Sequence, residues 1–291
     1  MSLFLKFNLI LLLVFAVGLV PTGIVFGHLL EDNAREQVLA NAEIMMETAM
    51  AMRGYTVSEV RPLIADQMDE TFLPQSVPAY SATQIFEALR KQHPEYTYKE
   101  ATLNPSNPRN RAVDWETDIV AEFSRNPERP EITGERDTPL GRSLYLAHPI
   151  RITNENCLTC HRTPEEAPAS MVKLYGDANG FGWKMNETIG AQIVSVPMSL
   201  PLDSANRTWW TLMTALGTLL LAALGLLNIL LHFVVIRPVK RLSRLADDVS
   251  RGNLEAEPMV VKGNDEVSVL ARSFQRMRIS LVQAMKMLGD E

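Results

Sequence analysis

Two long apolar blocks, separated by a mostly polar segment, constrain the fold of this chain more than any other feature. They occupy residues 7–30 and 209–236. A helix rises about 1.5 Å per residue, so each block is long enough to cross a hydrocarbon layer of about 30 Å. The first block is too long for the apolar core of a typical signal peptide, and no A-x-A cleavage site follows it. We therefore expect two membrane-spanning helices, the first of them an uncleaved anchor.

The residues at the two ends of the second block predict the orientation. Trp209 and Trp210 stand at its start, and aromatic side chains favour the membrane–water interface. Arg237, Lys240 and Arg241 follow its end, and basic residues favour the cytoplasmic side. The chain then divides into an N-terminal anchor (1–30), an extracytoplasmic domain (31–207), a second transmembrane helix (208–236) and a cytoplasmic segment (237–291).

A short cysteine motif lies within the extracytoplasmic domain. Cys157, Cys160 and His161 form the pattern C-x-x-C-H, the attachment signature of c-type haem, and the chain has no other cysteine. Two thiols about one helical turn apart can bond the two vinyl groups of a porphyrin. The adjacent imidazole then faces the iron as the proximal ligand. The motif therefore predicts one covalently bound haem c.

A disulfide loop, a zinc half-site and a thioredoxin-like redox pair are the alternatives to haem attachment. A structural zinc site needs four ligands, usually from two clusters, and the sequence holds no second cysteine pair. A thioredoxin-like pair needs a strand before it and a helix after it, whereas Asn154 and Pro164 give this motif a loop-like setting. Haem attachment also suits an exported domain, because a covalently held cofactor is not lost by dilution.

The remaining segments of residues 31–207 predict an α+β domain. Apolar residues recur at helical spacing over residues 33–69, and shorter helices are expected at 83–92 and 113–123. Residues 143–150 and 189–196 are rich in β-branched and aromatic side chains, which predicts strands on either side of the cysteine motif. No hydrolase triad, phosphate-binding loop or paired-carboxylate motif stands out, so we do not expect an enzyme. The net charge of −6 argues against nucleic acid as a partner.

Several motifs characterise this domain in addition to its two cysteines. They are MRGYT (52–56), VRPL (60–63), the spacing from Pro149 to C-x-x-C-H, GFGWK (180–184) and GAQIVSVPM (190–198). Their combination resembles the bacterial c-type haem PAS-like sensor family. The resemblance implies a PAS-like fold, in which the haem lies between a small antiparallel sheet and helices. It also implies an extracytoplasmic ligand or redox sensor, anchored in a bacterial inner membrane with its haem domain in the periplasm.

A methionine on the long predicted helix is the expected second axial ligand of the iron. In the family that the motifs resemble, some members use a cysteine there and others a methionine. This chain has no third cysteine, but Met46 and Met50 are four residues apart and share a helix face. A thioether is a suitable ligand for haem iron. We expect Met46 or Met50 in this role, with His148 as the runner-up, whereas core filling is the ordinary role of a methionine.

Four further side chains are candidates for the haem pocket. Arg53 and Arg61 are expected to pair with the haem propionates, because a guanidinium suits bidentate binding of a carboxylate. Tyr55 and Trp183 are expected to pack on the porphyrin. For each of the four, an ordinary core contact or surface ion pair is the alternative.

The segment after the second span carries an apolar seam. Its members alternate spacings of three and four: Val267, Leu270, Phe274, Met277 and Leu281. A shorter seam before it, together with Pro238, Gly252 and the pair Asp265–Glu266, resembles a HAMP signal-relay module. Neither seam can be buried within one chain, so we expect a homodimer through the HAMP helices, which form a parallel helical coiled coil. A plain dimerising coiled coil is the alternative.

These expectations combine into one leading hypothesis and two alternatives. The leading hypothesis is a membrane-bound haem c sensor of redox state or of a diatomic gas. It relays a signal through the HAMP bundle to a separate cytoplasmic partner such as a kinase or cyclase. The first alternative is a membrane-anchored monohaem c-type cytochrome for periplasmic electron transfer. The second is an interaction subunit whose haem is only structural.

Overall fold

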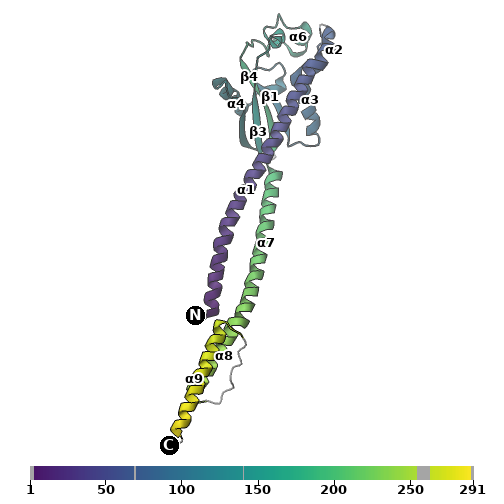
Figure 1. Cartoon of the computed structure of the whole chain (residues 1–291). Coiled ribbons are helices and arrows are strands. Elements are labelled where there is room, and N and C mark those ends of the chain that lie inside the picture. The colour runs from purple at the N-terminus through teal and green to yellow at the C-terminus, as the bar shows by residue number, and fades with distance from the viewer. Residues whose placement is uncertain (1–2, 69, 140, 254–262, 290–291) are drawn as a thin grey trace. The chain divides into compact units, whose positions relative to one another are not determined.

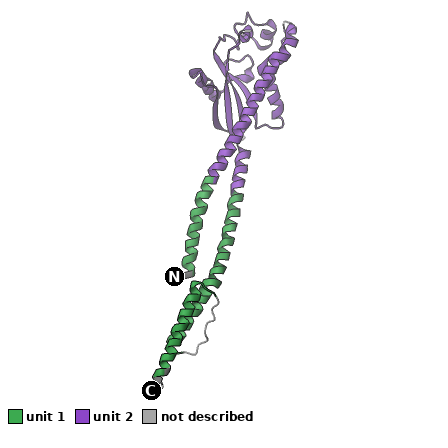
Figure 2. Ribbon diagram, in the orientation of Figure 1, with its two compact units in different colours: residues 1–25, 210–291 green, residues 26–209 purple. Residues whose placement is uncertain are grey.

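The computed structural model describes residues 3–68, 70–139, 141–253 and 263–289. It divides into two compact units, residues 1–25 with 210–291 and residues 26–209 (Figure 2). Helices α1 (Leu3–Tyr55) and α7 (Ser199–Leu231) each contribute residues to both units. The larger unit contains the cysteine motif, and the smaller one contains the predicted HAMP segment.

The larger unit is an α+β domain built on a four-stranded antiparallel sheet (Figure 1). After α1 come a π-helical turn (Thr56–Val60), α2 (Arg61–Ile64), α3 (Pro78–Arg90), β1 (Thr97–Thr102), α4 (Asp114–Arg125), β2 (Ile132–Thr138), β3 (Gly141–Arg151), α5 (Leu158–His161), α6 (Ala169–Tyr175) and β4 (Thr188–Pro197). The strand order is β1-β4-β3-β2. The predicted fold class, a PAS-like α+β domain between two candidate membrane helices, is confirmed.

Both faces of this sheet are covered by helices. Along β3, Leu144 and Leu146 point to one face and Ala147 points to the other, as the alternation of side chains along a strand requires. Helices α1 and α3 cover the first face, and α4 covers the second (Figure 1). The first core contains Val38, Ala42, Met46, Ala49, Ala82, Phe86, Tyr98, Leu144, Leu146, Val194, Val196 and Met198. The second contains Ala101, Ile119, Val120, Phe123, Ile132, Ala147, Ala191 and Ile193.

Helix α1 continues without a break from the first apolar block into the larger unit. Its buried face is formed by Val38, Ala42, Met46 and Ala49, whose spacings of four, four and three keep them on one side of the helix. After the π-helical turn, helical residues extend to Gln67, which confirms the predicted helix over residues 33–69 apart from its end. Asp69 lies outside the described residues.

The other sequence-predicted elements agree with the structure to within a few residues. Helices α3 and α4 correspond to the segments expected at 83–92 and 113–123, and strands β3 and β4 to those at 143–150 and 189–196. Strands β1 and β2 and helix α6 were not predicted. Both missed strands are largely polar, TYKEAT and ITGERDT, so they lack the apolar alternation by which strands are recognised.

Most of both apolar blocks lies in the smaller unit. The helical segments that contain them, Phe4–Gln67 and Ser199–Ser250, extend into the larger unit and are long and apolar enough to cross a membrane. Only 6% and 0% of their most apolar windows are buried. Such exposure is unlike that of a core helix. Within this unit Asn8 and Asn228 join α1 to α7 through reciprocal side-chain hydrogen bonds, each 2.8 Å long. Each amide also donates to a carbonyl of its own helix, at Phe4 and Leu224 respectively.

Helices α8 (Arg237–Ser250) and α9 (Glu266–Gly289) follow α7 and a π-helical turn (His232–Ile236). They pack on one another, burying Leu242 and Val249 of α8 and Ala271 of α9. Gly252 ends α8 with a φ of +92°, in the left-handed region that favours glycine. Three members of the predicted seam remain 46–56% exposed in the single chain: Leu270, Met277 and Leu281.

Candidate cofactor site

The cysteine motif forms a helical turn rather than the expected loop. A 3₁₀ turn (Glu155–Cys157) leads directly into α5, and Asn154 begins it by accepting a hydrogen bond of 2.9 Å from the backbone N–H of Asn156. Residues three apart share a helical face. Cys157 and Cys160 are both free and half-buried, and both line one cavity of about 300 Å³. Burial raises the pKa of the Cys160 thiol, and the charge of nearby Arg61 opposes that effect.

The imidazole of His161 is held from two sides. Its Nδ1 lies 2.6 Å from the carbonyl oxygen of Gly180, and its ring stacks on Trp183 with a centroid separation of 3.7 Å and an interplanar angle of 14°. A carbonyl oxygen can only accept, so Nδ1 carries the proton and Nε2 retains its lone pair. Burial lowers the pKa of His161, although the hydrogen bond with Gly180 opposes this effect. A neutral imidazole with a fixed tautomer is the form that binds metal.

Apolar side chains form much of the cavity wall. They are Val57, Met68, Phe72, Ile150, Ile152, Met171 and Ile189. Arg53, Arg61 and Arg109 supply positive charge, and His161 and Trp183 line the same space. The hydroxyl of Ser106, another lining residue, is buried and has no hydrogen-bond partner in the described part of the chain. An apolar cavity with a few convergent polar groups is typical of a cofactor site.

The residues present fit a haem. Two free thiols stand one helical turn apart, and the adjacent histidine has its ligand nitrogen available. The apolar wall suits the porphyrin body, and the arginines suit its carboxylates. The structure offers no comparable support for zinc, because the described residues contain no group of three or more His, Cys, Asp or Glu side chains arranged to hold a metal ion.

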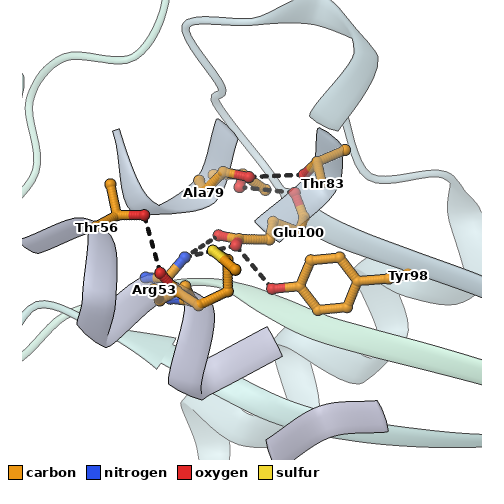
Figure 3. Close-up of polar contacts among 8 residues, drawn as sticks. Arg53, Thr56, Ala79, Thr83, Tyr98 and Glu100 are labelled. Carbon is orange, nitrogen blue, oxygen red and sulfur yellow. Dashed lines mark hydrogen bonds and ion pairs between the residues drawn. The ribbon is translucent and has the colours of Figure 1, made fainter. Parts of the chain in front are cut away.

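Arg53 lines the cavity but already has a carboxylate partner (Figure 3). Its guanidinium lies 2.5 Å from Glu100, whose side chain is only 4% exposed and also accepts a hydrogen bond of 2.7 Å from Tyr98. Burial favours the neutral form of Arg53, but Glu100 and Tyr98 outweigh it, and the pKa of the guanidinium is raised above its usual value. Arg53 therefore joins α1 to β1 through this ion pair and also lies at the cavity, where its pairing with a haem propionate was expected.

The other three pocket candidates have different positions. Arg61 lies at the cavity, as expected. Trp183 also lines it, where it supports the ring of His161. Tyr55 is 55% exposed and is not part of the cavity wall. At the end of α1 its side chain lies off the face that carries Arg53 and Val57, because residues two apart point in different directions on a helix.

Neither Met46 nor Met50 reaches the cavity. Met46 is 1% exposed and packs in the first core, and Met50 is 47% exposed. The buried face of α1 at these residues contacts the sheet, and the cavity begins one to two turns later at Arg53. The structure instead places the thioethers of Met68 and Met171 at the cavity wall. Sequence reasoning missed both because Met68 stands at the end of the predicted helix and α6 was not predicted.

His148, the runner-up for the second ligand, is also remote from this wall. It lies on β3 with Nε2 3.6 Å from the carboxylate of Glu131, and it is absent from the cavity lining. Sequence reasoning also gave no role to Gly180 and Asn104, although Gly180 holds the imidazole of His161. Their roles depend on contacts between segments more than seventy residues apart.

Comparison with known proteins identifies the family of this chain. A family model described as Tll0287-like matches residues 31–197, more than half of the chain, and a HAMP domain model matches residues 230–283. The chain belongs to the Tll0287-like family, a PAS-like sensor family, and carries a HAMP domain. The family resemblance read from the sequence motifs is thereby confirmed.

A solved structure, "Crystal structure of the cyanobacterial heme-protein Tll0287", is similar to this chain at 16% sequence identity with a TM-score of 0.40. The match covers 55% of this chain and 94% of that one. A comparison with curated proteins gave no match.

Proposed function

We propose that this protein is a membrane-bound haem c sensor whose cavity holds one haem. Cys157 and Cys160 bind it through thioether bonds, and His161 is the proximal iron ligand. The observation that carries this proposal is the state of His161: Gly180 holds the Nδ1 proton, which leaves Nε2 as the ligand atom on a side chain that shares one cavity with both thiols. When bound, haem supplies an iron that changes redox state and can bind a diatomic gas at an open position.

Arg61 and Arg109 are the proposed partners of the haem carboxylates. Both line the cavity, and Arg109 lies over the ring of Tyr80 at 5.3 Å. Arg53 is a third candidate: it lines the cavity, and both of its hydrogen bonds to Glu100 come from Nη1, so this ion pair can persist while another nitrogen of the guanidinium donates to a haem carboxylate. Tyr55 is excluded by its position outside the wall.

Met171 is the first candidate for the second axial ligand, in place of Met46 or Met50. It is 3% exposed and lines the cavity. Met68 lines it too, but its sulfur accepts hydrogen bonds from the Leu73 backbone N–H at 3.4 Å and from the Ser76 hydroxyl at 3.3 Å. Those contacts would have to break before Met68 could bind a metal. A thioether is a weak ligand that a gas can displace, which suits a sensor.

The proposed topology places residues 31–207 in the periplasm and residues 237–291 in the cytoplasm of a bacterial inner membrane. Basic residues after the second span support this orientation. The exposed seam of α9 supports a homodimer, because a second copy would cover Leu270, Met277 and Leu281 in a parallel bundle. A separate kinase or cyclase is the proposed receiver of the signal.

Helix α1 is the proposed route from the cavity to the membrane. It carries Arg53, and the π-helical turn that follows it carries Val57; both side chains line the cavity. The same helix continues back into the first apolar block. A change of redox state or ligation in the cavity would therefore act on this helix, and a small shift is enough to switch a HAMP bundle between two packings.

Absorption spectroscopy of the purified full-length protein tests the proposal. We expect a haem that survives denaturation and extraction in acid acetone, and its covalent retention should be lost in Cys157→Ala/Cys160→Ala. Ferrous haem that binds carbon monoxide would support gas sensing. A six-coordinate haem that ignores carbon monoxide, together with fast reduction by a quinol analogue, would favour the electron-transfer cytochrome instead. A protein without a haem band would overturn the proposal.

A further inference from the structure

The loop at residues 179–183 holds the imidazole of His161 from both its face and its edge. Gly180 provides the carbonyl for Nδ1 at 2.6 Å, and Trp183 provides the stacked ring. Backbone hydrogen bonds also join this loop to the motif. The N–H of Trp183 donates to the carbonyl oxygen of His161 at 3.2 Å, and the N–H of Gly182 donates to the carbonyl oxygen of Arg162 at 2.9 Å. The position of this loop therefore fixes the orientation of the imidazole.

Asn104 anchors this loop from a distant part of the chain. It follows β1, and its side chain makes two hydrogen bonds of 3.3 Å with consecutive residues of the loop. Its Oδ1 accepts from the N–H of Gly180, and its Nδ2 donates to the carbonyl of Phe181. A third contact supports the same loop, since Arg111 donates to Asn179 Oδ1 at 3.0 Å. One amide side chain thus holds the 179–180 and 181–182 peptide units, and the unit that carries the Gly180 carbonyl lies between them.

Gly180 allows the two segments to approach to backbone distance. Its φ is +87°, in the left-handed region that other residues rarely adopt. A Cβ at this position would lie 1.9 Å from Ser106 Oγ and 2.8 Å from the Ser106 backbone nitrogen. Any larger residue must push the loop away from residues 104–106. The hydrogen bond between Asn104 and Gly180 and the close approach of Gly180 to Ser106 therefore belong to one contact between residues 104–106 and the loop.

We propose that Asn104 is a positioning residue for the proximal ligand, and that through Gly180 it sets the reduction potential of the iron. This inference rests on the proposed haem. A hydrogen bond from the Nδ1–H of a ligating histidine raises the basicity of the imidazole. A more basic ligand stabilises ferric over ferrous iron, so it lowers the potential. Loss of the Asn104 anchor frees the Gly180 carbonyl, weakens its bond to His161 and shifts the potential upward.

The test is a potentiometric titration of the full-length protein in detergent, with Asn104→Ala and the near-isosteric Asn104→Leu. Both variants lose the bonds to Gly180 and Phe181, and neither adds a charge near the haem. We expect an upward shift of the potential in both, with changed electron paramagnetic resonance g values in the ferric state. Asn126→Ala is the matched control: this asparagine is exposed, bonds to Glu122, and should leave the potential unchanged.

Gly180→Ala tests the same contact from its other side and should shift the potential in the same direction. A haem-loaded Asn104→Ala protein with the wild-type potential and g values would overturn the inference, whatever its thermal stability. If Asn104→Ala does not fold, an unshifted Asn104→Leu protein overturns it equally. A wild-type chain without covalent haem refutes the proposed function, and that result is distinct from haem attached at an unshifted potential.

Discussion

Breaking the ion pair between Arg53 and Glu100 should destabilise the larger unit far more than breaking a surface pair on the same helix. In Arg53→Ala the Glu100 carboxylate, 4% exposed, keeps only the hydroxyl of Tyr98 as a partner. Removing one member of a buried pair costs about 3–5 kcal/mol, because the remaining charge stays desolvated. For a domain of this size, 1 kcal/mol corresponds to about 2–4 °C in Tm, so we expect a fall of roughly 6–20 °C.

Arg35→Ala is the matched control for this prediction. Arg35 also joins α1 to the sheet, through Glu135 at 3.1 Å, but its side chain is 61% exposed. Exposed pairs contribute about 0–1 kcal/mol, so its Tm should fall by no more than about 4 °C. The assay is thermal unfolding of the full-length protein, followed by near-ultraviolet circular dichroism. Equal shifts in the two variants would refute the argument that burial decides the cost.

A double substitution separates the effect of losing the ion pair from the cost of leaving the Glu100 carboxylate buried and unpaired with a cation. In Arg53→Met/Glu100→Gln both charges are removed, and a neutral amide can still accept from Tyr98. A buried pair replaced as a unit often costs little. The double variant should therefore unfold at a higher temperature than Arg53→Ala. A lower Tm would mean that the pair stabilises the fold beyond the cost of a lone buried carboxylate.

Three further predictions concern other contacts. Burial, reinforced by the charge of Glu100, raises the pKa of Tyr98 well above its usual 10. Above about pH 10 the folded state therefore keeps a proton that the unfolded chain loses, and the free energy of unfolding should fall as the pH rises. Unfolding measured as a function of pH should show a less steep fall in Tyr98→Phe. Asn8→Leu should destabilise the paired spans by about 0.6–1.7 kcal/mol, with recovery in Asn8→Leu/Asn228→Leu, as measured by unfolding in sodium dodecyl sulfate. Met46→Ala should lower the free energy of unfolding by about 2–5 kcal/mol, because Met46 fills the core. Its haem absorption spectrum should match that of the wild type. An altered spectrum would indicate that Met46 is an iron ligand.

The sequence predicted those parts of the fold that depend on local pattern. The two spans and strands β3 and β4 have long apolar or β-branched runs. The segments expected from these runs correspond to observed helices and strands, and the largest differences are at the ends of helices. Strand β1 was missed because its sequence, TYKEAT, alternates around charged residues. Glu100 can be buried there because Arg53, 47 residues earlier in the chain, pairs with it. The local sequence around β1 does not indicate this pairing.

The candidate site likewise has one part that local sequence predicts and another that depends on contacts between distant segments. Cys157, Cys160 and His161 are adjacent in sequence, so their shared cavity follows from one helical turn. Met46 and Met68 are equally plausible ligands by type, and only the packing of α1 on the sheet decides which of them meets the cavity. Asn104 gave no signal at all, since its two bonds reach residues 76 and 77 positions away.

The proposed sensor function requires that the state of the haem changes the packing of the HAMP helices. Met277→Cys tests it most directly, because Met277 is 56% exposed on the α9 seam and the native cysteines are both engaged if haem is attached. Crosslinking of the introduced thiols of two chains by a bismaleimide, which needs no oxidant, would be followed in membranes with the haem oxidised, reduced and treated with carbon monoxide. We expect a crosslinking rate that differs between at least two of these states. The same rate in all three, in a protein with covalent haem, would contradict it.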